Sequence, residues 1–195
     1  LRSYLGYQRQ ISSNLLDQTI GDSPIESYNS KFFIFGVHFA QMQNNKIFPT
    51  KTFFSGDFGV GNRERAAQSS RQWKIELNLN HIFNLNFRHS IYINNQSAFL
   101  LSENYLTNEL FRFGGINSIR GFEENSIDAS AFSILRTEYR YLLSENLFIH
   151  SIADAGYFDN DILEMNSTLY SLGIGLGIYT KTGLFRFIIA NGRTV

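Results

Sequence analysis

Long runs of alternating polar and apolar residues dominate this 195-residue sequence. In WKIELNLN (73–80) every second residue is apolar, and the residues between are Lys, Glu or Asn. A period of two indicates a β-strand, because successive side chains of a strand point to opposite faces of its sheet. No segment has a convincing helical period. The pattern predicts an all-β protein with nine strands, at 3–11, 31–42, 51–60, 73–80, 83–94, 134–142, 147–157, 168–180 and 183–192.

The predicted strands are long, and their connections differ in length. A strand of about 11 residues, rising about 3.3 Å per residue and tilted about 45°, spans roughly 25 Å, which is enough to cross a bilayer. Alternation of long and short connections is typical of outer-membrane barrels, which have short periplasmic turns and long external loops. The predicted connections are, in order, 12–30, 43–50, 61–71, 81–82, 95–130, 144–145, 158–167 and 181–182.

Alternation is compatible with a soluble barrel and with a membrane barrel, which differ in the face that is apolar. Aromatic residues make up 15% of the chain, and no apolar run approaches the roughly 20 residues of a membrane-spanning helix. The polar face carries arginine and glutamate side chains that a wide, hydrated lumen would solvate. Strand length, loop asymmetry and these polar groups favour a transmembrane antiparallel β-barrel. Outward-facing residues should then include Phe87, Ile91, Tyr139, Phe185 and Phe187.

An odd number of strands leaves an unpaired edge in an antiparallel barrel. Either 98–111 contains a tenth strand, or the chain is part of a larger wall. We prefer the second interpretation.

Three segments carry the most specific signal: GGINSIRGF (114–122), IADAGYF (152–158) and GIGLGIYTKTGLFRF (173–187). Together they resemble the C-terminal barrel of the BamA superfamily, which includes barrel-assembly insertases, TamA-like translocation proteins and two-partner secretion transporters. The resemblance implies a sixteen-stranded barrel in the bacterial outer membrane, preceded by periplasmic POTRA domains. Residues 1–195 would be its C-terminal part, with about nine strands that begin near the seventh and end one short.

The resemblance also implies a site. In this superfamily a long external loop, here 95–130, folds back into the lumen, and its arginine meets acidic residues of the inner wall. Ile152 stands where the family usually has an aromatic residue. The matching positions, which we call the loop lock, are Arg120, Gly121 and Phe122 on the loop and Glu138, Asp154 and Gly156 on the wall.

Residue parity agrees with this site independently. Asp154 shares its strand face with His150, and Glu138 lies between Arg136 and Arg140 on the polar face. A guanidinium can donate two parallel hydrogen bonds to a carboxylate, and such charge-assisted pairs are stronger than neutral ones. Arg120 should therefore lie within ion-pair distance of Asp154 or Glu138. The alternatives are a solvated loop arginine and an ordinary hydrated carboxylate. Gly121 would allow a tight turn, and Phe122 would wedge the loop against the wall.

Other motifs give no chemistry. Gly173, Gly175 and Gly177 are spaced two apart with no helix after them, so we expect them to make room for the loop rather than to bind phosphate. The histidines lack zinc-site spacing, and 159–161 lack the remainder of a calcium loop. There is no GxSxG or HExxH motif. We expect no catalytic residue, cofactor or metal, and a formal net charge of zero gives no reason to expect nucleic acid.

The favoured function is assembly, insertion or translocation of proteins at the outer membrane, without catalysis. The resemblance leaves two alternatives: the pore of a two-partner secretion transporter, and the barrel anchor of a lipase-like domain. A soluble or simple-pore barrel is a further candidate. The expected partners are the lipid bilayer, unfolded outer-membrane or secreted client proteins and accessory assembly subunits, with no nucleic acid.

Overall fold

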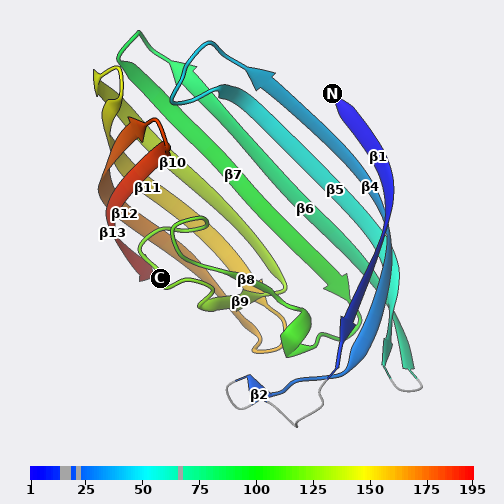
Figure 1. The fold of residues 1–195 in the computed structure, drawn as a ribbon. Helices are drawn as coiled ribbons and strands as arrows, with labels where there is room; N and C mark the ends of the chain where they lie inside the picture. The colour runs from blue at the N-terminus through cyan, green and yellow to red at the C-terminus, as the bar shows by residue number, and fades with distance from the viewer. Residues whose placement is uncertain (14–18, 21–22, 66–67) are drawn as a thin grey trace.

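One curved antiparallel sheet makes up most of the fold (Figure 1). The computed structural model describes residues 1–13, 19–20, 23–65 and 68–195. Within these ranges nine strands form the sheet, in the order β1–β4–β5–β6–β7–β10–β11–β12–β13. The predicted all-β class and strand number are confirmed. The strands are β1 (Arg2–Ser12), β4 (Tyr28–Met42), β5 (Thr50–Arg65), β6 (Gln68–Asn84), β7 (His89–Ser102), β10 (Ala131–Ser144), β11 (Leu147–Asn160), β12 (Met165–Thr180) and β13 (Gly183–Thr194).

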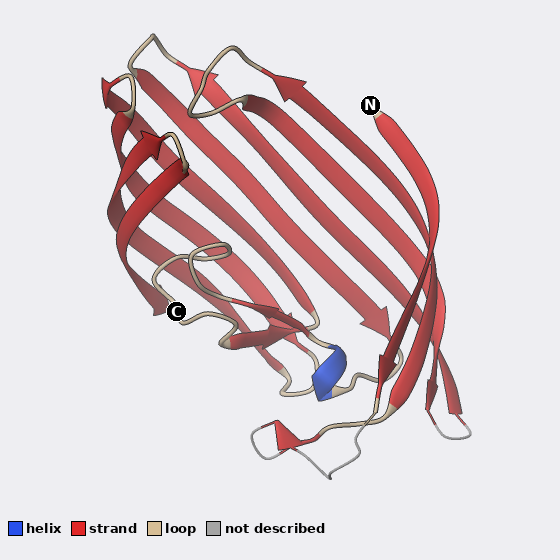
Figure 2. Cartoon of the chain, viewed as in Figure 1, coloured by secondary structure: helices blue, strands red, loops and turns tan. Residues whose placement is uncertain are grey.

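Short elements lie outside this sheet (Figure 2). β2 (Thr19–Ile20) pairs with β3 (Ser23–Pro24), and β8 (Phe111–Phe113) pairs with β9 (Ile127–Ala129). The segment 98–111 does not add a strand to the sheet: it contains the end of β7, the 3₁₀ helix η1 (Thr107–Glu109) and the first residue of β8. No helix in the described part of the chain is long and apolar enough to cross a membrane.

The predicted turn at 81–82 is wrong. β6 continues to Asn84, and the turn to β7 lies at 85–88. There the side-chain oxygen of Asn86 accepts hydrogen bonds from the backbone amides of Arg88 and His89, at 2.9 and 3.0 Å. An asparagine that binds the backbone two or three residues ahead stabilises a turn. Because the alternating pattern runs unbroken through this turn, the pattern could not locate it.

Other predicted connections are too long. β5 and β6 extend into the predicted connection 61–71, where Arg63 pairs with Ser70, and residues 66–67 lie outside the described part. The connection predicted at 158–167 shortens to 161–164, and the loop predicted at 95–130 begins after β7, at 103. Polar residues continue these strands because the backbone ladder does not depend on apolar side chains. The predicted alternation of long and short connections is therefore wrong at 61–71 and 158–167; the predicted connection 12–30 lies partly outside the described residues.

The convex face of the sheet is apolar, as predicted for a wall that meets lipid. Of the residues named for this face, Tyr139, Phe185 and Phe187 are 45%, 52% and 63% exposed. Phe87 is 82% exposed but lies in the turn at 85–88 and not in a strand. Ile91 is half-buried. A soluble barrel would instead cover such side chains in a closed core. The exposed apolar face that these side chains form is suited to contact with the hydrocarbon core of a bilayer.

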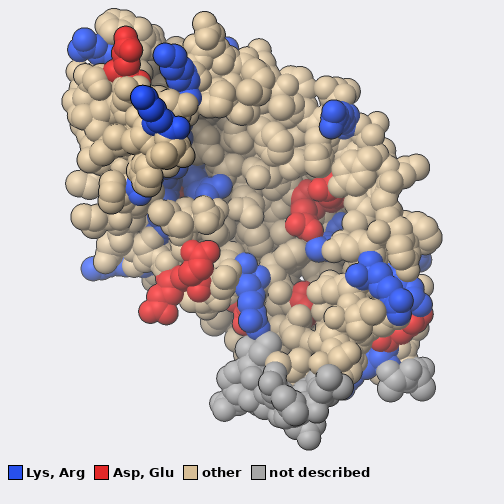
Figure 3. All heavy atoms as spheres, in the orientation of Figure 1, with Lys and Arg blue, Asp and Glu red and all other residues tan. Residues whose placement is uncertain are grey.

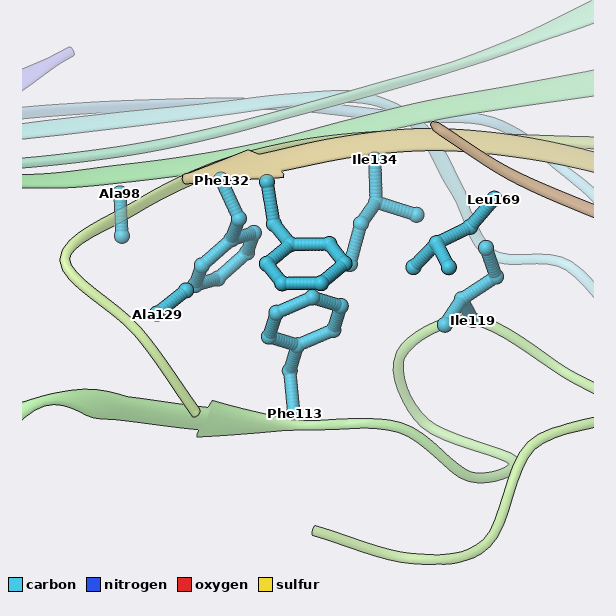
Figure 4. Packing of buried hydrophobic residues seen from close by; sticks show 8 residues of the cluster. Ala98, Phe113, Ile119, Ala129, Phe132, Ile134 and Leu169 are labelled. Atoms are coloured by element: carbon cyan, nitrogen blue, oxygen red, sulfur yellow. The ribbon is translucent and has the colours of Figure 1, made fainter. Parts of the chain in front are cut away.

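The concave face combines charged and apolar side chains. Figure 3 shows basic and acidic side chains within the hollow of the sheet. Beside them, buried apolar residues pack between the sheet and the connection 103–130, which lies in the hollow (Figures 1 and 4). The inner face was expected to be polar, and apolar residues on it pack where the loop covers part of this face. The packed residues are Ala98, Phe113, Ile119, Ala129, Phe132, Ile134, Phe158 and Leu169.

Candidate functional site

The connection 103–130, hereafter the loop, is a folded structure. β8 and β9 pair within it, and Arg112 forms an ion pair with Asp128 across them at 2.9 Å. Two glycines begin the tip with positive φ angles, +117° at Gly114 and +91° at Gly115. Residues with a side chain rarely adopt such angles. This backbone carries Ile119 and Arg120 toward the sheet, where both are buried.

Arg120 contacts both acidic residues of the loop lock. Its Nε and Nη2 atoms donate to the two carboxylate oxygens of Asp154, at 2.8 and 2.5 Å, and its Nη1 atom donates to Glu138. The backbone amide of Arg120 also donates to Asp154, at 3.2 Å. All three side chains are at most 4% exposed. The contact with Asp154 is a bidentate, charge-assisted pair that is shielded from water. Such a pair fixes the orientation of the guanidinium as well as its position.

The pairing of β10 with β11 explains why the two carboxylates lie together. Arg136 is opposite Asp154 and Glu138 is opposite Ile152, and all of these positions lie on the concave face. Side chains two residues apart on one strand share a face, so the register places both carboxylates under the loop tip.

Further arginines surround this pair of acids. Arg140 donates from Nε to Glu138 at 2.7 Å, and Arg186 of β13 donates from Nη2 to the same carboxylate at 2.6 Å. Arg136 donates to the side-chain oxygen of Asn94 and to the backbone oxygen of Asn117 in the loop tip, at 2.6 Å for the latter. The sequence analysis placed Arg136 and Arg140 on the polar face but assigned them no part in the site. The sequence feature that could have assigned them to the site is that they lie on the same face of the strand as Glu138.

The remaining loop-lock residues act through close packing. Gly121 has a φ of +84°, and a Cβ there would lie 2.6 Å from the backbone nitrogen of Gly192 on β13. The Phe122 ring lies against Gly192, in the space that a side chain at 192 would fill. On β11, a Cβ at Gly156 would lie 3.3 Å from Ile119 of the loop. Phe122 therefore packs on the last strand of the sheet as well as against the buried apolar cluster in the hollow.

The glycines of β12 do not make room for the loop. A Cβ at Gly175 would overlap the ring of His150, and one at Gly177 would overlap the ring of Phe148. Both rings belong to β11, which pairs with β12. These glycines were expected to make room for the loop, and this expectation is wrong. The space that they leave is filled by side chains of the adjacent strand.

A second polar contact holds the beginning of the loop. Glu109 of η1 accepts hydrogen bonds from Arg63 of β5 and from Gln72 of β6, the latter at 3.0 Å. Sequence reasoning missed it, since Arg63 and Glu109 both lay in predicted connections. Within the described residues, no group of three or more His, Asp or Glu side chains is arranged to hold a metal ion.

These features define a class of protein: part of a β-barrel wall whose concave face holds an inserted loop through a buried ion network. Residues 7–180 match the family described as haemolysin secretion/activation protein ShlB/FhaC/HecB. The match covers most of the chain, and the chain belongs to this family. The resemblance to the BamA superfamily is confirmed, and the protein is located in the outer membrane of a Gram-negative bacterium.

A solved structure has a similar fold. CdiB from Acinetobacter baumannii matches with a TM-score of 0.51 and 14% sequence identity, over 88% of this chain. The match covers 35% of the CdiB chain, so the present chain spans about a third of that protein's length. A search of curated protein sequences finds no match.

Proposed function

We propose that the protein is the outer-membrane transporter of a two-partner secretion system, and that it moves a secreted client protein without catalysing a reaction. The family match carries this proposal. It favours the secretion pore, one of the alternatives left open by the sequence, over insertion of outer-membrane proteins. The partners are then the lipid bilayer around the convex face and an unfolded client within the hollow.

In this proposal, residues 1–195 are part of a larger barrel, and the loop folds into its lumen as a plug. The buried contacts of Arg120 with Asp154 and Glu138 support this role, because they hold the tip in the hollow that a client would have to enter. Transport then requires the tip to move aside. Removing one partner of a buried ion pair is costly, so a client must compensate for the contacts that it displaces.

Deleting the gene in its host tests this function and separates it from its rivals. A secretion transporter is needed for release of a client, so we expect one protein to disappear from the medium while other outer-membrane barrels keep their normal amounts. Broad loss of outer-membrane barrels would favour the insertase instead. Wild-type protein supplied from a plasmid should restore the secreted protein, and a release defect that it does not restore would contradict the proposal.

A further inference from the structure

The loop is attached to the sheet at two separate groups of strands. Its tip is bound to β10 and β11 through Arg120, and Phe122 packs on β13. Its beginning, at η1, is bound to β5 and β6 through Glu109. In the strand order, β7 lies between these two groups, so the loop bridges the hollow of the sheet.

The attachment at η1 is buried and well connected. The side chains of Arg63 and Glu109 are each 4% exposed. Besides Arg63 and Gln72, Glu109 accepts a hydrogen bond from the backbone amide of Leu106 at 2.9 Å, which fixes the first turn of η1. A carboxylate held by a guanidinium, an amide and a backbone donor has the partners that a buried charge requires. We call Arg63, Gln72 and Glu109 the base clasp.

Asn108, next to Glu109, extends the attachment to the first strands. Its Nδ2 atom donates to the hydroxyl of Ser12 at 2.7 Å and to the backbone oxygen of Glu26 at 2.8 Å. Its backbone oxygen accepts a hydrogen bond from the hydroxyl of Tyr28 at 3.3 Å. η1 therefore contacts β1 and β4 as well as β5 and β6, and none of these contacts involves the loop lock.

We propose that Arg63 and Glu109 are positioning residues that keep the base of the loop on the wall when the loop lock opens. The tip then swings about η1 as a hinged arm, which clears the hollow without releasing the whole loop. This inference deepens the proposed function and rests on it for the claim that the loop moves at all. It separates two events that a single attachment would couple: release of the tip and release of the base.

Cysteine labelling of the intact protein in cells can follow these two events separately. The chain contains no cysteine, so Leu110→Cys supplies a base thiol and Ser118→Cys supplies a tip thiol; both positions are 8% exposed. With Arg120→Ala, we expect a maleimide to label the tip thiol about tenfold faster while the base thiol stays protected. With Arg63→Glu, which sets a second carboxylate against Glu109, we expect the base thiol to label about tenfold faster.

The matched control is Lys31→Glu, which removes the exposed ion pair with Glu64, the neighbour of Arg63 on β5. It should leave both labelling rates unchanged. Equal exposure of the base thiol and the tip thiol in Arg120→Ala would overturn the inference, since the loop would then have no independent hold at its base. Continued protection of the base thiol in Arg63→Glu would overturn it equally.

Folding of each variant is checked by the shift in electrophoretic mobility that folded barrels show on heating. If Arg63→Glu does not fold, Arg63→Gln removes the charge with less repulsion and carries the same expectation for the base thiol. The labelling experiment does not require a client protein. If the protein secretes nothing, the proposed function is contradicted, but the labelling rates still test the base clasp.

Discussion

Arg186 on β13 donates from Nη2 to Oε1 of Glu138 on β10, at 2.6 Å. The two strands are separated in the sheet by β11 and β12. Arg120 of the loop donates to the same oxygen, and Arg140 donates to the other. Glu138 thus joins the loop tip, its own strand and the last strand of the sheet, and its charge is needed by several buried guanidinium groups.

Replacing Glu138 with glutamine should destabilise the protein strongly. The substitution keeps the shape but leaves the guanidinium groups of Arg120 and Arg140 buried with less compensating charge, which should cost about 3–5 kcal/mol. The midpoint of urea unfolding in detergent or vesicles measures this loss. Glu76→Gln, in an ion pair whose glutamate is 50% exposed, is the control and should change stability by less than about 1 kcal/mol. Similar midpoints for the two variants would contradict the role of Glu138.

Gly192→Ala should displace the loop tip without altering any charge. The new methyl group would overlap the ring of Phe122, so the ring must move. Maleimide labelling of Ser118→Cys should therefore become faster, and adding Phe122→Ala should return it toward the original rate. Gly59→Ala, where a Cβ meets atoms at 3.5 Å and beyond, is the control. Unchanged labelling in Gly192→Ala would argue against the packing of Phe122 on β13.

Arginine on the convex face should impair folding into lipid. Phe187 is 63% exposed on this face, and an arginine near the bilayer midplane of a barrel costs about 2–4 kcal/mol. Phe187→Arg should therefore lower the free energy of unfolding from phospholipid vesicles by about that amount. Thr182→Arg, in the exposed turn before β13, should have little effect. An equal and small effect of both substitutions would contradict the assignment of this face to lipid.

The sequence was informative wherever side-chain parity decides the outcome. Alternation places Glu138 and Asp154 on one face and Tyr139 and Phe187 on the other, because the period of a strand is fixed at two. The structure brings Arg120 to both carboxylates, a contact first expected from a motif and from this parity. Nothing in the alternation itself specified which loop residue would reach them.

The contacts that escaped prediction depend on geometry between distant segments. Arg63 and Glu109 are 46 residues apart, and each looks like an ordinary surface charge in a connection. Phe122 was expected to wedge the loop against the wall, but the sequence did not indicate that its ring would lie against Gly192 of β13. The turn at Asn86 was missed because turn residues there continue the pattern of the strands. Register, loop path and turn position arise from pairings that a single sequence does not encode locally.

Ion conductance of the intact protein in planar bilayers measures whether the loop occupies the lumen and is held there by Arg120. We expect low conductance for the wild type, and a clearly higher conductance when residues 114–126 are replaced by a short Gly-Ser linker or when Arg120 is replaced by alanine. Equal conductance in all three proteins, with each shown to be folded, would contradict this expectation.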